Sequence, residues 1–171
     1  MKKMVFLMVL LLSLCGCSKP AWETVEDVLP PVPVGLWTEE AYVIQIDMPE
    51  ETQLTEEEQT WKIYSTDQGD FEIETRTFLA ASASEAVKTI SGYSEEELTI
   101  LQTSRFDLPE YRFAWVTQTE QGSKLCRADL VMNGTECYAV ICSVNETAGN
   151  AYEDQIRYVF STFGLSVDEE V

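Results

Sequence analysis

The chain has 171 residues, of which 11 are basic and 30 are acidic, and it contains no histidine. A formal net charge of -19 argues against nucleic acid as a partner, because affinity for phosphates comes from clustered Lys and Arg side chains. The missing histidine excludes Ser-His-Asp and Cys-His hydrolases and every zinc site with a histidine ligand. No P-loop, dinucleotide-binding glycine pattern or GxSxG motif occurs, so we expect a protein that is not an enzyme and holds no cofactor.

Residues 1–16 are predicted to form a secretory signal peptide. Two lysines precede an apolar run over residues 4–14, which is too short to span a bilayer, because a spanning helix needs about 20 apolar residues. The sequence LCGC at residues 14–17 resembles the bacterial lipobox. This resemblance implies that the chain is cut between Gly16 and Cys17 and that the thiol of Cys17 is acylated. We therefore expect a protein anchored through lipid on Cys17 at the extracytoplasmic face of the cell membrane. The alternative is an ordinary secretory signal with incidental cysteines.

The exported part divides into three predicted segments. Residues 17–36 form a lipidated, proline-rich tether, residues 37–166 a single α+β domain, and residues 167–171 an acidic tail. Removing residues 1–16 removes two lysines and no acidic residue, which leaves nine basic and 30 acidic residues and a formal charge of -21. An anionic membrane surface repels such a domain, so its lipid must hold it there.

Strand patterns begin directly after the tether. Residues 41–48 are predicted to be a strand, and residues 50–59 a charged connection. Residues 60–65 and 70–79 are predicted to form a hairpin, in which alternation along the second arm gives one packed face and one face in water.

Capping signals mark the helices. Residues 82–85 form a predicted capping box that starts a short helix ending at Gly92, and residues 94–97 form a second box that predicts a single turn. A closing helix is predicted over residues 150–163 with Gly164 as its C-cap. Its apolar face comprises Tyr152, Ile156, Val159, Phe160 and Phe163.

Between the helices, short turns separate four predicted strands of an antiparallel meander, at residues 98–107, 110–119, 123–132 and 136–145. In the last hairpin we expect a three-residue loop, Met132-Asn133-Gly134, with a left-handed Gly134 in a bulge. A two-residue Asn133-Gly134 loop would turn the apolar face of one arm to water.

Three cysteines remain after Cys15 is cleaved away and Cys17 is acylated. The expected hairpin register places Cys126 and Cys142 one diagonal step apart on the core face, with Cys137 on the other side. That spacing is usually too wide for an unstrained disulfide. The cysteines are therefore interpreted as small buried apolar residues, and a Cys126–Cys142 disulfide is the alternative.

Two sets of residues are candidates for binding. Tyr111, Phe113 and Trp115 alternate on one strand face, which indicates either core beneath a helix or a binding platform. Asp67 and Asp70 are weak candidates for a calcium ligand pair, but the twelve-residue spacing of a calcium loop is absent, and solvated turns are the simpler interpretation.

The meander and its closing helix, which ends YVFSTFGL at residues 158–165, resemble the C-terminal half of the PsbP and Mog1 group of α+β domains. The match covers roughly residues 41–165 in element order, although Thr162 here interrupts the Ser-Phe pair of the group. The resemblance implies an antiparallel sheet sandwiched by helices and a role in assisting or docking onto larger assemblies. We therefore expect a membrane-anchored, non-enzymatic module that binds a protein partner, with a small-ligand or ion-binding module as the alternative.

Overall fold

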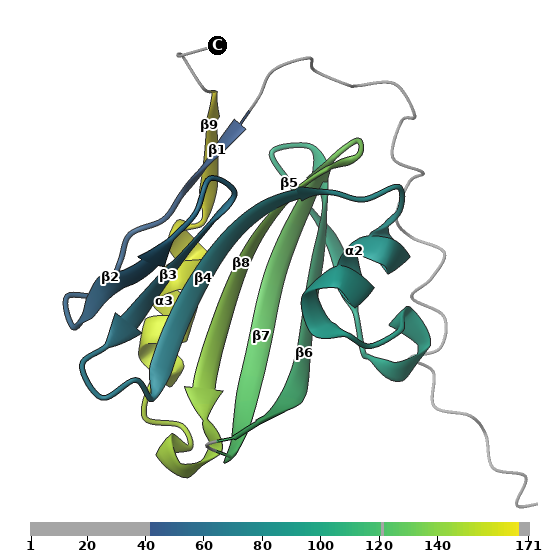
Figure 1. Ribbon diagram of the computed structural model, residues 1–171. Helices are drawn as coiled ribbons and strands as arrows, with labels where there is room; N and C mark the ends of the chain where they lie inside the picture. Colours follow the sequence, from purple (N-terminus) through teal and green to yellow (C-terminus); the bar gives the residue numbers. More distant parts are fainter. Residues whose placement is uncertain (1–41, 121, 168–171) are drawn as a thin grey trace, which may run out of the picture. The chain divides into compact units, whose positions relative to one another are not determined.

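The computed structural model describes residues 42–120 and 122–167 of the chain. Their main feature is a seven-stranded antiparallel sheet in the order β2-β3-β4-β8-β7-β6-β5 (Figure 1). Its strands, in chain order, are β2 (Thr52–Glu57), β3 (Trp61–Thr66), β4 (Phe71–Leu79), β5 (Leu101–Arg105), β6 (Leu108–Thr119), β7 (Gly122–Asn133) and β8 (Glu136–Asn145). A smaller sheet pairs β1 (Tyr42–Gln45) with β9 (Gly164–Val167).

Two α-helices pack on opposite faces of the large sheet (Figure 1). Helix α3 (Glu153–Thr162) buries its apolar side against β4 and β8, whereas α2 (Ala83–Ser91) packs against β6, β7 and β8. Two single 3-10 turns, η2 (Glu95–Glu97) and η3 (Glu146–Ala148), complete the described elements. The structure is therefore α+β and dominated by antiparallel strands.

The elements predicted from capping and periodicity are largely confirmed. The strands β5, β6, β7 and β8 are consecutive neighbours in the sheet, as a meander requires. Helix α2 has Ser82 as its N-cap and a left-handed Gly92 as its C-cap. The Glu85 carboxylate accepts a hydrogen bond from the amide of Ala81, at 2.8 Å, and not from that of Ser82 as a capping box requires.

The predicted charged connection at residues 50–59 is wrong, because it contains the edge strand β2. Charged residues are compatible with this strand because almost all of its side chains are exposed at the edge of the sheet. A register shift between Leu54 and Glu56 interrupts its pairing with β3.

The predicted bulged hairpin between β7 and β8 is also wrong. Asn133 pairs with Glu136, so the loop is the two residues Gly134 and Thr135, and Gly134 has φ 68° at the first central position. The prediction assumed that one face of each arm lies in water. Over residues 128–133 of β7 and most of β8 both faces are buried instead, and the polar side chain of Asp129, at 1% exposure, lies inside the protein.

Two smaller expectations also need correction. Gly164 is the first residue of β9 and pairs with Gln45, and the C-cap of α3 is Phe163. On β4, the charged face is half-buried and neutralised, with Lys124 2.5 Å from Glu72 and Arg76 2.6 Å from Glu74.

The signal peptide, Cys17 and the tether lie outside the described residues, as does the tail beyond residue 167. Among the residues that are described, no helix is long and apolar enough to cross a membrane.

Candidate functional site

Helix α3 covers only part of its face of the sheet. Its apolar contacts come mainly from β4 and β8, with Val131 from β7. Beyond them, three large apolar side chains remain in contact with solvent: Leu101 is 60% exposed, Val116 42% and Leu125 39%. The strand register places them on the same face of the sheet, since Val116 pairs with Leu125 and Leu101 pairs with Arg112. We call this surface the open face, defined as Leu101, Arg112, Ala114, Val116, Leu125 and Arg127.

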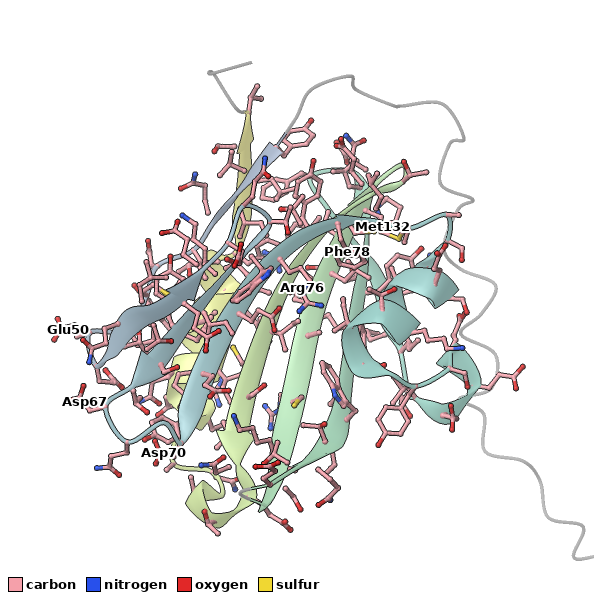
Figure 2. The ribbon with its side chains drawn as sticks, viewed as in Figure 1. Glu50, Asp67, Asp70, Arg76, Phe78 and Met132 are labelled. Carbon is pink, nitrogen blue, oxygen red and sulfur yellow. The ribbon has the colours of Figure 1, made fainter. Side chains whose placement is uncertain are left out.

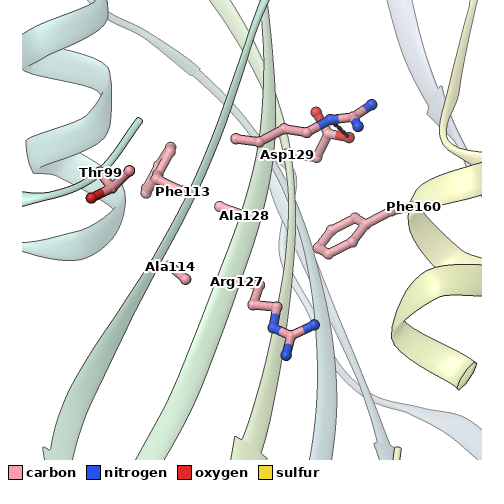
Figure 3. A pocket seen from close by; sticks show the side chains of 8 residues that line it. Thr99, Phe113, Ala114, Arg127, Ala128, Asp129 and Phe160 are labelled. Atoms are coloured by element: carbon pink, nitrogen blue, oxygen red, sulfur yellow. Dashed lines mark ion pairs between the residues drawn. The ribbon is translucent and has the colours of Figure 1, made fainter. Parts of the chain in front are cut away.

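A pocket of about 350 Å³ lies between the open face and α3. Figure 3 shows Phe160 reaching from α3 toward the strands that carry Arg127 and Asp129. A volume of this size is within the range of small-molecule sites, roughly 300–1,000 Å³. The residues that line it are Thr99, Arg112, Phe113, Ala114, Arg127, Ala128, Asp129 and Phe160.

Four charged side chains form a cluster at the border between the pocket and the core. Glu110 and Asp129 are each 1% exposed. Glu110 accepts hydrogen bonds from Arg105 Nε at 2.5 Å and from an Arg112 terminal nitrogen at 3.0 Å. Asp129 Oδ2 lies 3.1 Å from a terminal nitrogen of Arg105 and 3.3 Å from Arg112 Nε. Each carboxylate therefore contacts both guanidinium groups, the pairing that a buried charge requires.

Arg105 also fastens this cluster to α3. Its guanidinium donates to the carbonyl oxygens of Phe163, at 2.6 Å, and Phe160, at 3.4 Å. It lies over the Phe163 ring with its Cζ 5.1 Å from the ring centroid. A positive charge at the C-terminal end of a helix is also favoured by the helix dipole. The cluster thus joins three neighbouring strands to the end of the helix.

The two buried carboxyl groups differ in acidity. Burial and the neighbouring carboxylate of Glu110 raise the pKa of Asp129 to about 7. Burial also opposes ionisation of Glu110, but its hydrogen bonds, of which that from Arg105 is the largest, hold its pKa below the usual value. When Asp129 is protonated, the four groups together carry one positive charge beside the pocket.

The second guanidinium of the pocket belongs to Arg127. It makes a paired contact with Glu153 at the start of α3, with nitrogen to oxygen distances of 2.9 and 2.8 Å. Its side chain remains 44% exposed, and that of Arg112 46%. The pocket therefore combines an apolar wall with two guanidinium groups that still have free donors, an arrangement suited to an apolar molecule with an acidic group.

The aromatic residues chosen from the sequence lie on the opposite face of the sheet. Phe113 is 4% exposed and belongs to the core beneath α2, with Tyr111 and Trp115 packed against the same cluster. The rings of Phe113 and Trp115 stack with centroids 5.6 Å apart. Their packing agrees with the core interpretation, and only Phe113 also contributes to the lining of the pocket.

The three described cysteines are buried and free. Cys126 pairs with Ser143 and Arg127 pairs with Cys142, so Cys126 and Cys142 lie on opposite faces of the sheet. The expected diagonal arrangement is wrong because it depended on the bulged hairpin. Burial raises the pKa of the Cys137 thiol to about 11 and that of Cys142 to about 12, which makes both thiols poor nucleophiles.

Asp67 and Asp70 lie in the turn between β3 and β4 (Figure 2). Asp70 accepts hydrogen bonds from the hydroxyl groups of Tyr152, at 2.7 Å, and Thr66, at 2.9 Å. These hydrogen bonds, that from Tyr152 first, lower the pKa of Asp70. Asp67 accepts from Gln53 at 2.5 Å. The described part of the chain contains no group of three or more Cys, Asp or Glu side chains placed to hold a metal ion.

Sequence reasoning missed the charged cluster and the pocket. The available signal was the placement of Glu110 and Arg112 among the apolar residues of the first half of β6, and of Asp129 between Ala128 and Leu130 in β7. Alternation alone assigns these positions to water. The pairings of Arg105 with Leu108 and of Arg112 with Asp129 bring the charges together, and neither can be seen without the register.

No family model matches the chain, and no curated protein matches its sequence. Solved structures with a similar fold include the PsbP protein CyanoP from Synechocystis sp. PCC 6803, with a TM-score of 0.52 and 10% identity over 78% of this chain and 96% of that one. LpqN of Mycobacterium tuberculosis, described as involved in cell envelope biogenesis, has a TM-score of 0.51 and 8% identity over 75% and 86%.

A protein of Bacteroides thetaiotaomicron has a TM-score of 0.50 and 10% identity, with 74% of this chain covering 46% of that one. The chain thus spans about half the length of that protein. At such identities the similarity shows the fold alone, and the described residues adopt a PsbP-like α+β fold.

Proposed function

We propose that this protein is a membrane-anchored, extracytoplasmic lipoprotein that binds a partner protein through the open face and catalyses no reaction. The open face carries the proposal, because it exposes three large apolar side chains beside two guanidinium groups in an otherwise strongly acidic chain. Exposed apolar surface bordered by charged groups is typical of interaction sites.

The chemistry of the chain supports a binding role. The sequence has no histidine, and the pKa values of the three described thiols are raised by burial. The perturbed carboxyl group, Asp129, is 1% exposed and paired with two arginines, of which Arg105 also binds the end of α3, so it has little access to a substrate. Similarity to CyanoP and to an envelope-biogenesis protein agrees with an accessory role.

Anchoring through Cys17 rests on the lipobox resemblance and is tested together with partner binding. The wild-type protein and a Cys17→Ser variant are expressed in the native host, labelled with an alkyne fatty acid, cross-linked in membranes and affinity-purified. We expect label and a stoichiometric partner with the wild type and neither with the variant. Equal membrane association of both forms would refute anchoring, and the absence of a partner from both would refute the binding role.

The pocket supports a second candidate function, the binding of a small apolar anion. The Phe160 ring and the alanines at 114 and 128 supply apolar contacts, while Arg112 and Arg127 supply donors for an acidic group. Anilinonaphthalene sulfonate, an aromatic anion, is a suitable fluorescent probe. Arg112→Gln should weaken its binding about tenfold, the effect of losing roughly 1.4 kcal/mol, while Arg157→Gln on the exposed side of α3 should not. Equal binding to both variants would exclude the pocket as the site.

A further inference from the structure

The two outer strands of the large sheet protect their free edges differently. Within the described residues, β2 and β5 each have a neighbour on one side only. A free strand edge presents unpaired amide and carbonyl groups, and proteins usually block it with charge, proline, a bulge or a covering element. The two edges of this sheet can therefore be compared by those criteria.

The edge at β2 has two such protections. Its pairing with β3 is broken by a register shift between Leu54 and Glu56. It also lies in an acidic stretch that includes the exposed residues Glu56 and Glu57, and Glu50 lies just before its start (Figure 2). A strand added at β2 would meet both a distorted ladder and concentrated negative charge.

The edge at β5 has neither protection. Residues 98–104 read LTILQTS and contain no charged residue and no proline, and Arg105, the last residue of β5, is paired with the buried carboxylates of Glu110 and Asp129. The pairing of β5 with β6 is continuous over all five residues, without a register shift. Leu101 is 60% exposed, and Gln102 and Ser104 are also exposed. Uncharged segments rich in Thr, Ile and Leu pair readily with other strands.

We propose that the β5 edge takes up an extended, mainly apolar segment of a partner polypeptide as an eighth strand of the sheet. Main-chain hydrogen bonds to β5 supply the affinity of such strand addition, and alternate side chains of the added strand supply specificity. Side chains on one side of the added strand lie against Leu101, at the margin of the open face. This inference rests on the proposed binding function and specifies the kind of partner segment and the edge that receives it.

A second copy of the chain is a less suitable occupant. Two chains that each carry a formal charge of -19 repel one another when their sheets are joined edge to edge. A peptide segment of a different protein does not have to bring that charge with it. The charge balance therefore favours a heterologous segment over self-association.

The chain offers a matched pair of variants for a test. Leu101→Lys introduces a charge at an exposed leucine of β5, and Leu54→Lys introduces the same charge at a leucine of β2 that is 47% exposed. Both side chains are largely in solvent, so both variants should fold. Lysine at an edge strand opposes pairing with a further strand.

The probe is a phage-displayed library of random linear peptides, selected on the full-length protein in detergent. We expect enriched peptides to bind the wild type and Leu54→Lys equally and Leu101→Lys about tenfold more weakly, the effect of roughly 1.4 kcal/mol. Hydrogen exchange should show that a bound peptide protects amides of β5 and leaves those of β2 unchanged.

Three outcomes would overturn the inference: no enrichment of peptides, protection confined to other elements, or equal loss of affinity in both lysine variants. Sedimentation without peptide provides a further check, because a dimer that Leu101→Lys dissociates would assign the edge to a second copy. The selection requires neither anchoring nor the natural partner. Recovery of a membrane partner together with failure at β5 would therefore leave the proposed function intact and remove only this inference.

Discussion

The two halves of the sheet face beneath α3 are built differently, although they belong to the same sheet. On the β4 and β8 side, the side chains of Phe71, Ile73 and Val140 are fully buried under the helix. On the β5 to β7 side, Leu101, Val116 and Arg112 remain exposed, and a pocket takes the place of close packing. Stability is thus concentrated in one half, which leaves the other half available for binding.

The charged cluster of Arg105, Glu110, Arg112 and Asp129 lies between the covered half and the open face. Arg105 holds Glu110 and Asp129 on the sheet side and the carbonyl oxygens of α3 on the helix side. The buried ion pairs therefore hold the end of α3 against β5, β6 and β7 at the border of the open face.

The largest change in the free energy of unfolding is expected in the half of the sheet face that α3 covers. Phe71→Ala removes a fully buried ring that stacks on Tyr152 with centroids 4.9 Å apart, and it should lower the free energy of unfolding by about 3–5 kcal/mol. Val116→Ala on the open face should change it by less than about 0.5 kcal/mol. Urea denaturation measures both. Similar losses at the two positions would show that the two halves do not differ in packing.

Replacement of Arg105 tests how much the charged cluster contributes to stability. Arg105→Ala leaves two buried carboxylates with one exposed guanidinium, so we expect a loss of roughly 3 kcal/mol in urea denaturation. Arg157→Ala, which breaks an ion pair with Asp154 in solvent, should cost less than about 1 kcal/mol. Adding Asp129→Asn to Arg105→Ala should recover part of the loss, because one unpaired buried charge is removed. A fully additive double variant would argue against a coupled cluster.

The pH dependence of stability tests the state of Asp129. Its raised pKa means that the folded protein keeps this proton up to about pH 7, whereas the unfolded chain releases it near 3.8. Between those values the folded state holds more protons, so this group makes stability fall as pH rises. We expect Tm to be a few degrees higher at about pH 5 than at about pH 8, and Asp129→Asn to remove most of that difference. An unchanged pH dependence in the variant would assign it to other groups.

The smallest effect concerns the cysteines. With Cys126 and Cys142 on opposite faces of the sheet, a reducing agent should leave Tm unchanged. Iodoacetamide at pH 8 should modify Cys126, Cys137 and Cys142 only after denaturation, because burial raises the pKa of each thiol. Peptide mass spectrometry identifies the modified positions. A linked Cys126–Cys142 peptide from the native protein would contradict the observed register.

Local sequence signals predicted most of the elements but did not fix how they pair. The capping residue Ser82 and the left-handed Gly92 define α2 because both act within a single turn of chain. Strand β2 was missed because its acidic residues favour a loop wherever position within the sheet is unknown. At an edge the same residues are well solvated and protect the strand from further pairing.

The candidate site was harder to predict because it depends on long-range register. The alternation of β7 assigned Asp129 to a wet face, and the bulged loop was predicted because it keeps the apolar side chains of both arms inside. In the structure Arg105, 24 positions earlier in the chain, neutralises Asp129 and allows it to be buried. The two-residue loop of Gly134 and Thr135 shifts the register from the predicted bulged hairpin and places Cys126 and Cys142 on opposite faces of the sheet, because a shift of one residue exchanges the two faces of a strand.

A site-specific cross-link shows directly whether the partner protein lies against the open face. A photoreactive residue is introduced at Val116 on the open face or, as a control, at Tyr158, which is 46% exposed on α3. Each variant is irradiated in native membranes, and the fraction of the chain converted to a defined adduct is measured. We expect efficient formation of a single adduct from position 116 and little from position 158. Equal yields, or an adduct formed from position 158 alone, would contradict this expectation.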